Sequence, residues 1–317
     1  MKAVMYHYVR SPSSDLPYFT YLDVDNFTRQ LDFFSQEFGF VRQEDFASWI
    51  QRPHAVERPD GVILTFDDGF RDHVDTVQPI LKESNLWGIF YIPTHMLSTG
   101  EILDVHKIHL LLGKLGPERC LELLNASSAI EMFPDIVVED FRLKTYSRQT
   151  TSSEQTKTFK RMLNYFVDYQ WRRQLLDRLE ISAFEIAGYQ APDVSDVYIT
   201  TEELRALSDD GHIIGSHSVS HRLMSKLSAE DQAQEIYESQ QFLEAICGRE
   251  VATYCHPYGG FHSFNDDTER ILSAASFRYS FNVEARDIDV EDLVGRPQAL
   301  PRYDCNLFPY GQATVTA

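Results

Sequence analysis

The chain has 317 residues, of which 43% are apolar and 13% aromatic, so it can bury a large core and lacks the composition of a disordered protein. Its 48 acidic residues outnumber 29 basic ones and give a formal net charge of −19. This balance argues against nucleic acid and anionic membrane surfaces as partners, because both bind clustered lysine and arginine.

Strand and helix patterns alternate in the first part of the chain. Short apolar runs that end at Asp or Pro are typical of strands buried on both faces of a parallel sheet. Apolar residues at helical spacing lie between these runs. The predicted strands are Ala3–Val9, Gly61–Phe66 and Gly88–Pro93, and the predicted helices are Val24–Phe38 and Val74–Glu83.

Strand-like runs become rare from residue 97 to residue 195. Phe159, Met162, Leu163 and Phe166 recur at helical spacing after Thr151–Glu154, which has the pattern of a capping box. We interpret 97–195 as a largely helical insertion or subdomain. The sequence does not decide whether this segment is a lid over the site or a dimer surface. A homo-oligomer is therefore one of the alternatives.

The alternation of strand and helix returns near residue 196. Thr200–Glu203 has the pattern of a second capping box, and Gly211 ends the helix that follows it. Further predicted elements are a strand at His212–Gly215, a helix at Ala229–Ile246 and a strand at Val251–Tyr254. Strand–helix units with short loops predict a parallel α/β sheet or barrel, built from residues 1–96 and 196–317.

Cysteine usage and hydropathy indicate the cellular setting. The chain has no C-x-x-C pair and too few cysteines for a disulfide scaffold. No run approaches the roughly 18 apolar residues of a membrane-spanning helix, and the apolar residues before Arg10 and Pro12 are too few for the core of a secretory signal. We therefore expect a cytoplasmic protein without an integral membrane segment.

Polar residues follow three of the predicted strands. Asp67 and Asp68 follow the strand Gly61–Phe66, and His217 and His221 follow the strand His212–Gly215. The turn at 257–259 follows the strand Val251–Tyr254. Because the carboxyl ends of parallel strands meet at one edge, these residues should converge. Two imidazoles and a carboxylate form a zinc-like site with an open position for water. Each motif alone is usually just a turn or cap, but the combination favours a metal centre.

These motifs resemble those of a known family. Thr65–Gly69 (TFDDG), His217–His221 (HSxxH) and His256–Gly259 (HPYG) are similar, in this order, to the successive motifs of the polysaccharide deacetylases, the NodB-like carbohydrate esterases of family four. The resemblance implies an α/β fold, a distorted (β/α)7 barrel, here with a largely helical insertion.

The resemblance also implies roles for individual residues. Asp67 matches the general base, and Asp68, His217 and His221 match the metal ligands, with zinc as the usual ion and cobalt or nickel as alternatives. The backbone N–H of Tyr258 would stabilise the oxyanion that forms during hydrolysis.

The sequence departs from the common family pattern in two ways. No arginine lies shortly before the Pro-Tyr turn. The late histidine that usually serves as the general acid in the family is also not evident, because His262 is the last histidine of the chain. Both features resemble the circularly permuted branch that includes poly-N-acetylglucosamine deacetylases. By that resemblance His7 is the candidate acid, although a histidine packed in an aromatic strand would look the same. Arg302 is a candidate to steady the site, and Pro257 and His256 are candidates for substrate contact or support.

The function that the sequence favours is a metal-dependent hydrolase that removes acetyl groups from an N-acetylated saccharide. Without a secretory signal, we expect an intracellular sugar, sugar nucleotide or glycan precursor as the substrate. Two alternatives stay open: an amidohydrolase acting on a non-sugar amide, and a carbohydrate-binding protein without turnover. For two further residues we expect structural positions: His73 on a helix surface, and Cys255 as a small residue of the core.

Overall fold

The structure is a computed structural model that describes residues 1–127 and 152–315. Backbone contacts divide the chain into two units, each of which is described by itself. Unit 1 comprises Met1–Ser11, Leu22–Glu101 and Val194–Gln312, and unit 2 comprises Pro12–Tyr21, Ile102–Asp193 and Ala313–Ala317.

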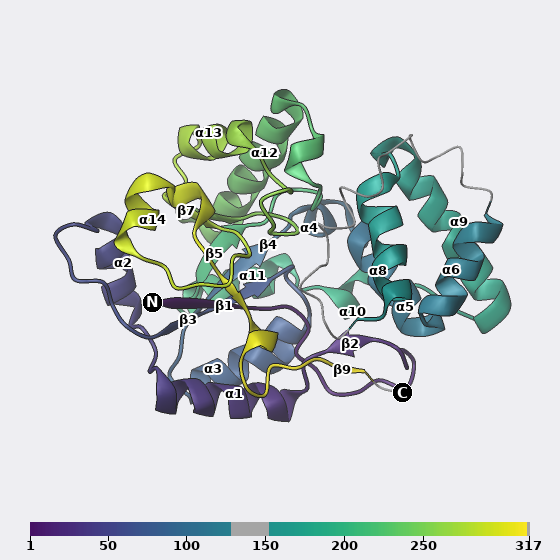
Figure 1. Cartoon of the computed structure of the whole chain (residues 1–317), viewed down its shortest axis with the longest axis horizontal. Helices are drawn as coiled ribbons and strands as arrows, with labels where there is room; N and C mark the ends of the chain where they lie inside the picture. The colour runs from purple at the N-terminus through teal and green to yellow at the C-terminus, as the bar shows by residue number, and fades with distance from the viewer. Residues whose placement is uncertain (128–151, 316–317) are drawn as a thin grey trace. The chain divides into compact units, whose positions relative to one another are not determined.

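A curled sheet of seven strands forms the centre of unit 1 (Figure 1). Every neighbouring pair is parallel, and the order is β7-β6-β5-β4-β3-β1-β8. This parallel arrangement with intervening helices confirms the predicted α/β barrel class. The strands are β1 (Lys2–Tyr6), β3 (Val62–Asp67), β4 (Gly88–Ile92), β5 (Ile213–Ser216), β6 (Thr253–Cys255), β7 (Tyr279–Phe281) and β8 (Tyr303–Asp304).

One short segment contacts both edges of this sheet. Leu300 forms a parallel bridge with Phe281 of β7, and its N–H donates to the carbonyl of Ser280 at 2.8 Å. A few residues later, β8 pairs with β1 at the other edge. The segment therefore curls the sheet toward a barrel and carries Arg302 between the two edges.

Side chains alternate between the two faces of each strand. In β3, Phe66 packs against Phe27 with ring centroids 6.2 Å apart and stacks on Phe90 with ring centroids 4.9 Å apart. Thr65 and Asp67 point the other way and both accept hydrogen bonds from Arg302. The alternation of a strand thus directs Asp67 into the barrel, one residue after a phenylalanine that packs outside it.

The helices of unit 1 lie close to their predicted positions. Thr200 and Glu203 form the expected capping box of α11. The predicted helix after β3 begins instead as a π-helix, η1 (His73–Val77), and continues as α3 (Gln78–Glu83). The other helices are α1 (Val24–Glu37), α2 (Gln43–Gln51), α4 (His95–Thr99), α10 (Val194–Val197), α11 (Thr201–Asp209), η4 (Met224–Lys226), α12 (Ala229–Cys247), α13 (Asp266–Ala274), α14 (Val290–Gly295), η5 (Pro297–Ala299) and η6 (Cys305–Leu307).

Unit 2 is mainly helical in its described part. The capping box predicted at Thr151–Glu154 is misplaced: Ser153 is the N-cap and accepts from the N–H of Thr156, while Thr151 lies outside the described residues. The elements are α5 (Asp104–Leu115), α6 (Pro117–Ala126), α8 (Glu154–Arg161), the π-helix η3 (Met162–Phe166), α9 (Tyr169–Ala187) and the antiparallel strands β2 (Thr20–Tyr21) and β9 (Thr314–Val315). Among residues 1–127 and 152–315, no helix combines the length and hydropathy needed to cross a bilayer.

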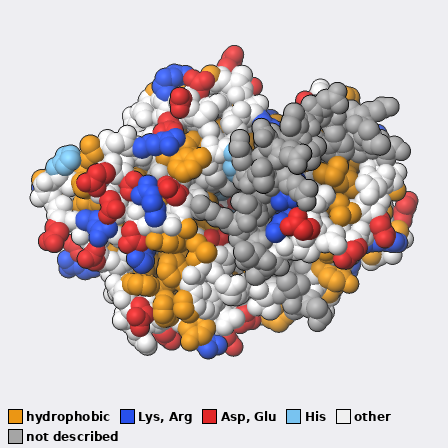
Figure 2. Space-filling model, in the orientation of Figure 1, with side chains coloured by type: hydrophobic (Ala, Val, Ile, Leu, Met, Phe, Trp, Pro, Cys, Tyr) orange, Lys and Arg blue, Asp and Glu red, His pale blue; other side chains and the backbone are white. Residues whose placement is uncertain are grey.

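The surface carries charges of both signs. On the face shown in Figure 2, acidic and basic side chains lie interspersed. Many are paired, as in the bonds of Arg42 to Asp45 and of Arg58 to Asp289. Such pairs are typical of a solvated surface and contribute little to stability.

Candidate active site

Several of the predicted site residues lie at the carboxyl ends of strands β1, β3 and β5. Asp67 is the last residue of β3 and Asp68 follows it, while His217 follows β5 directly. His7 follows β1 in the same way. The common direction of the strands therefore gathers residues from distant parts of the sequence at one end of the barrel.

Asp68, His217 and His221 converge as the sequence motifs predict. The Oδ1 atom of Asp68 lies 3.6 Å from Nε2 of His217 and 3.4 Å from Nε2 of His221. One ligand atom from each residue lies within 4.8 Å of the others, and all three residues are buried. This donor set of two imidazole nitrogens and one carboxylate oxygen fits a zinc-like cation.

The orientation of His217 supports this fit. Its Nδ1 atom lies 2.7 Å from the carbonyl oxygen of Cys255, which can only accept, so Nδ1 carries the proton. The lone pair of Nε2 then faces Asp68. Burial lowers the pKa of His217 and keeps the ring neutral. A histidine held through its second nitrogen in this way is typical of metal sites.

Asp67 makes different contacts from its neighbour. Arg302 donates to both of its carboxylate oxygens, at 2.8 Å to Oδ1 and 2.7 Å to Oδ2, and both side chains are buried. Burial acts to raise the pKa of Asp67, but the charge of Arg302, with contributions from His217 and His7, holds that pKa below its usual range. Asp67 is therefore ionised at neutral pH.

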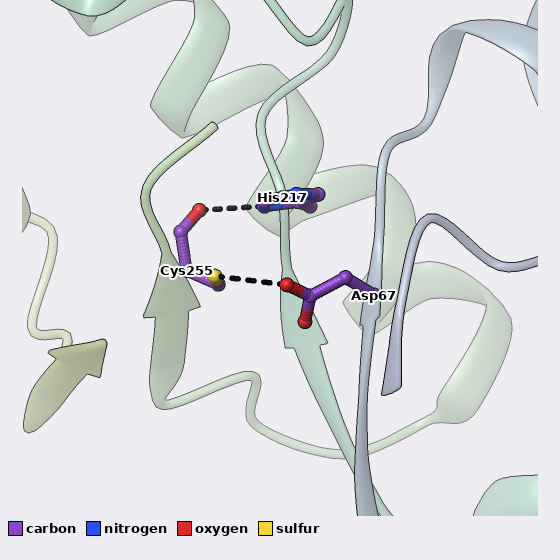
Figure 3. Close-up of side chains that lie close together, drawn as sticks. All are labelled: Asp67, His217 and Cys255. Carbon is purple, nitrogen blue, oxygen red and sulfur yellow. Dashed lines mark hydrogen bonds between the residues drawn. The ribbon is translucent and has the colours of Figure 1, made fainter. Parts of the chain in front are cut away.

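A second group of side chains could also be considered for a metal. Asp67, His217 and Cys255 lie close together, as Figure 3 shows, and the Cys255 thiol lies 3.7 Å from Oδ2 of Asp67. However, Arg302 occupies both oxygens of Asp67 and donates to Sγ of Cys255 at 3.0 Å. Burial also raises the pKa of that thiol well above its usual value. A cation therefore fits the group of Asp68 better than this one.

The loops of the site contain unusual backbone conformations. Asp68 has φ 81°, Ser218 65°, His221 54° and Tyr258 63°, all in the left-handed region that non-glycine residues avoid. Residues held in such conformations cluster at active sites and ligand clamps. These residues lie in three loops of the site, so the backbone of these loops fixes the direction of the site side chains.

His7 and Tyr258 both lie beside the metal-ligand group. Nε2 of His7 is 3.9 Å from Oδ2 of Asp67 and 4.0 Å from Oδ2 of Asp68, and 41% of its side chain is exposed. The ring of Tyr258 packs on that of His221, with centroids 5.0 Å apart. Pro257 is buried at the start of the turn, where the N–H of Gly259 donates to the carbonyl of His256.

His256 and His73 are buried among other side chains and hydrogen-bond to backbone carbonyl groups. His256 is buried, stacks on Phe264 at 3.7 Å, and its Nε2 donates to the carbonyl of Gln298 at 2.8 Å. These contacts favour the supporting reading of His256. The surface position expected for His73 is wrong, because its ring is fully buried and donates to the carbonyl of His7 at 3.0 Å.

Cys255 is the site residue that the sequence reasoning undervalued. It is a buried core residue as expected, yet its sulfur contacts both Asp67 and Arg302. The available signal was its position directly before the His256–Gly259 motif. The guanidinium that binds Asp67 comes from Arg302, which also donates to the sulfur of Cys255.

Comparison with known proteins relates this arrangement to one family. The sequence profile described as polysaccharide deacetylase matches residues 173–280, which include His217, His221 and the turn at 257–259. Asp67 and Asp68 lie outside the matched segment. No curated protein sequence was found to match the chain.

Several solved structures share the fold despite low sequence identity. The deacetylase PplD of Streptococcus pyogenes aligns at 15% identity over 96% of this chain and 91% of its own, with a TM-score of 0.58. IcaB of Ammonifex degensii aligns at 15% identity over 95% and 90%, with a TM-score of 0.54. A de-N-acetylase of Aggregatibacter actinomycetemcomitans aligns at 14% identity over 99% and 97%, with a TM-score of 0.55. The chain is therefore similar to the polysaccharide deacetylases in sequence over residues 173–280, and it shares the fold of these solved structures over most of its length.

Proposed function

We propose that the protein is a metal-dependent N-deacetylase that hydrolyses the acetamido group of an N-acetylated saccharide to acetate and a free amine. The observation that carries the proposal is the position of Asp68 Oδ1, 3.6 and 3.4 Å from two imidazole nitrogens, next to the ionised Asp67. The profile match supports the same reaction class.

Asp68, His217 and His221 would hold the cation. A divalent ion bound there, zinc with cobalt or nickel as alternatives, would activate a water and polarise the amide carbonyl. Asp67 would take the proton of the attacking water, because Arg302 fixes its carboxylate and keeps it ionised.

His7 and Tyr258 would complete the reaction. The Nε2 atom of His7 faces both aspartates, and its partly exposed ring lies where a substrate can reach it. It would donate a proton to the departing amine, without which the tetrahedral intermediate reverts to the amide. The backbone N–H of Tyr258 would stabilise the developing oxyanion.

Acetate release from N-acetylated sugars tests this proposal. Protein loaded with zinc or cobalt would be incubated with N-acetylated sugar nucleotides and with chitin oligomers, and free acetate measured. We expect acetate from at least one class, and Asp67→Asn should abolish turnover while the metal content per chain stays unchanged. Full activity in Asp67→Asn would refute the role of the base.

The two alternative functions are outcomes of the same experiment. Hydrolysis of a ureide or formamide without acetate from any sugar would indicate an amidohydrolase. Stoichiometric sugar binding with metal present but no acetate would indicate a binding protein. Either result would overturn the proposed N-deacetylase activity.

A further inference from the structure

Glu235 of α12 lies against the loop that carries both histidines. It is buried, with 9% of its surface exposed, and none of the sequence motifs includes it. Its Oε2 atom accepts from the backbone N–H of Val219 at 2.9 Å and of Ser220 at 2.8 Å. Its Oε1 atom accepts from the hydroxyl of Ser220. One carboxylate thus receives three hydrogen bonds from the residues between His217 and His221.

The same loop is held from its other side. Its carbonyl groups at Ser218 and Val219 accept from the N–H groups of Thr94 and His95, at 3.2 and 2.9 Å. These donors follow β4, so the loop lies between β4 and α12. Glu235 supplies the acceptors and the β4 side supplies the donors, and both groups of bonds fix the loop backbone.

The start of the loop is tied to α12 as well. Ser239, one turn after Glu235 on the same face of the helix, shares a 2.6 Å hydrogen bond with the hydroxyl of Ser216. The N–H of Ser218 donates to that hydroxyl at 3.3 Å, and the N–H of His221 donates to the hydroxyl of Ser218 at 3.0 Å. These bonds form a chain of contacts from α12 to His221.

The loop needs this support because its backbone is strained. Ser218 and His221 both have left-handed φ values, of 65° and 54°. Such conformations are energetically unfavourable for residues other than glycine and persist only where surrounding contacts determine them. Without the carboxylate, two partly buried N–H groups would lose their acceptor, and the loop would relax toward backbone conformations that separate the two imidazoles.

We infer that Glu235 is a positioning residue for the metal centre, which sets the spacing of His217 and His221 through the backbone between them. This inference rests on the proposed function, because it assumes that these histidines bind a cation. Partners that orient metal ligands typically change metal affinity by about 10–100-fold when they are removed.

Metal affinity in the full chain tests the inference without any substrate. Metal-free wild type, Glu235→Ala, Glu235→Gln and Glu238→Ala would be titrated with Zn²⁺ against a chromophoric chelator. Glu238 is exposed on the same helix and accepts a hydrogen bond from the side chain of Gln234, so it is the matched control. We expect Glu235→Ala to weaken zinc binding about 10–100-fold and the control to bind as wild type does.

Two comparisons separate positioning from general stability. The amide oxygen of Glu235→Gln can accept the same backbone bonds, so this variant should retain most of the affinity. The visible spectrum of bound Co²⁺, which reports ligand geometry, should change in Glu235→Ala and stay constant in Glu238→Ala. Folded Glu235→Ala with wild-type affinity and spectrum would overturn the inference.

A second variant covers the case in which Glu235→Ala does not fold. Ser220→Ala removes one of the three bonds and should weaken zinc binding in the same direction but less. If Glu235→Ala does not fold, wild-type affinity and an unchanged Co²⁺ spectrum in Ser220→Ala would refute the inference. Wild-type protein that binds no divalent cation would instead refute the proposed metal centre itself.

Discussion

Arg302 reaches Asp67 across 235 positions of sequence and donates to both oxygens of its carboxylate, at 2.8 and 2.7 Å. The pair is fully buried, and it lies where the segment after β7 passes between the two edges of the sheet. Arg302 also donates to Thr65 and to the sulfur of Cys255. A buried charge pair with this geometry controls the ionisation of Asp67.

Removal of Arg302 should therefore damage both stability and turnover. Arg302→Met leaves the Asp67 charge buried without its partner, which typically costs about 3–5 kcal/mol. Displacement of the base should lower kcat roughly a hundredfold or more. Urea denaturation and acetate release measure the two effects. Arg42→Met, which breaks an exposed pair with Asp45, is the control and should change neither.

The double variant shows whether the pair acts as a unit. In Asp67→Asn with Arg302→Met the unpaired carboxylate is gone, so the loss of stability should be well below the sum of the two single losses. Additive losses would contradict the coupling of these two residues.

Cys255 should matter through the same pair. Cys255→Ala removes the sulfur that contacts Asp67 and Arg302 and leaves a small buried space, so we expect a loss of about 1–2 kcal/mol in stability and a reduced kcat. Cys255→Ser keeps a donor beside Asp67 and should retain more activity than Cys255→Ala. Urea midpoints and initial rates of both variants test this order, and equal rates in the two variants would contradict it.

Two buried histidines predict loss of stability in acid. Burial lowers the pKa of His73 to about 4 and that of His256 to about 3, whereas an unfolded histidine titrates near pH 6.5. Between about pH 6.5 and these values the unfolded chain binds protons that the folded chain does not. The free energy of unfolding should therefore be highest above about pH 6.5 and should fall as the pH drops toward 4.

A variant that cannot titrate tests the assignment to His73. His73→Gln keeps a donor for the carbonyl of His7 but binds no proton. Urea midpoints measured from pH 8 to pH 4.5 should fall less steeply for this variant than for wild type. An unchanged slope would show that His73 does not contribute to the acid sensitivity.

Bound metal should stabilise the protein as well as activate it. A ligand that binds only the folded state adds about 2.7 kcal/mol at a concentration of 100 times its Kd. Zinc should therefore raise the Tm of the metal-free protein, and a chelator should reverse the shift and abolish acetate release. His217→Ala should show neither shift nor activity, whereas exposed His54→Ala should behave as wild type. A zinc-dependent Tm shift in His217→Ala would place the metal elsewhere.

Much of the fold was predictable because the signals are local. Short apolar runs such as Gly61–Phe66 predict buried strands, and the observed strand Val62–Asp67 differs from that run by one residue at each end. The helix predicted over Val24–Phe38 is observed as Val24–Glu37 for the same reason. The π-helix at His73–Val77 was not predicted, because its pattern of apolar residues hardly differs from that of an α-helix.

The metal-ligand group was predictable from strand order, but its supports were not. Asp68, His217 and His221 occur in recognisable motifs at strand ends, and parallel strands bring such ends together. Glu235 gave only a weak signal, as a polar residue next to Ile236 on the buried face of α12. Nothing in that helix indicates which loop its carboxylate contacts.

The sequence by itself determined β1, β3, β4, β5 and β6, their parallel arrangement and the polar residues that follow them, because the pattern of each strand depends on neighbours within a few positions. Only the tertiary structure decided that Arg302 pairs with Asp67, that Cys255 touches both, and that Glu235 holds the loop between the histidines. Those contacts depend on how far the sheet curls and on where a distant segment crosses it. These are properties of the packed chain as a whole, which no local pattern encodes.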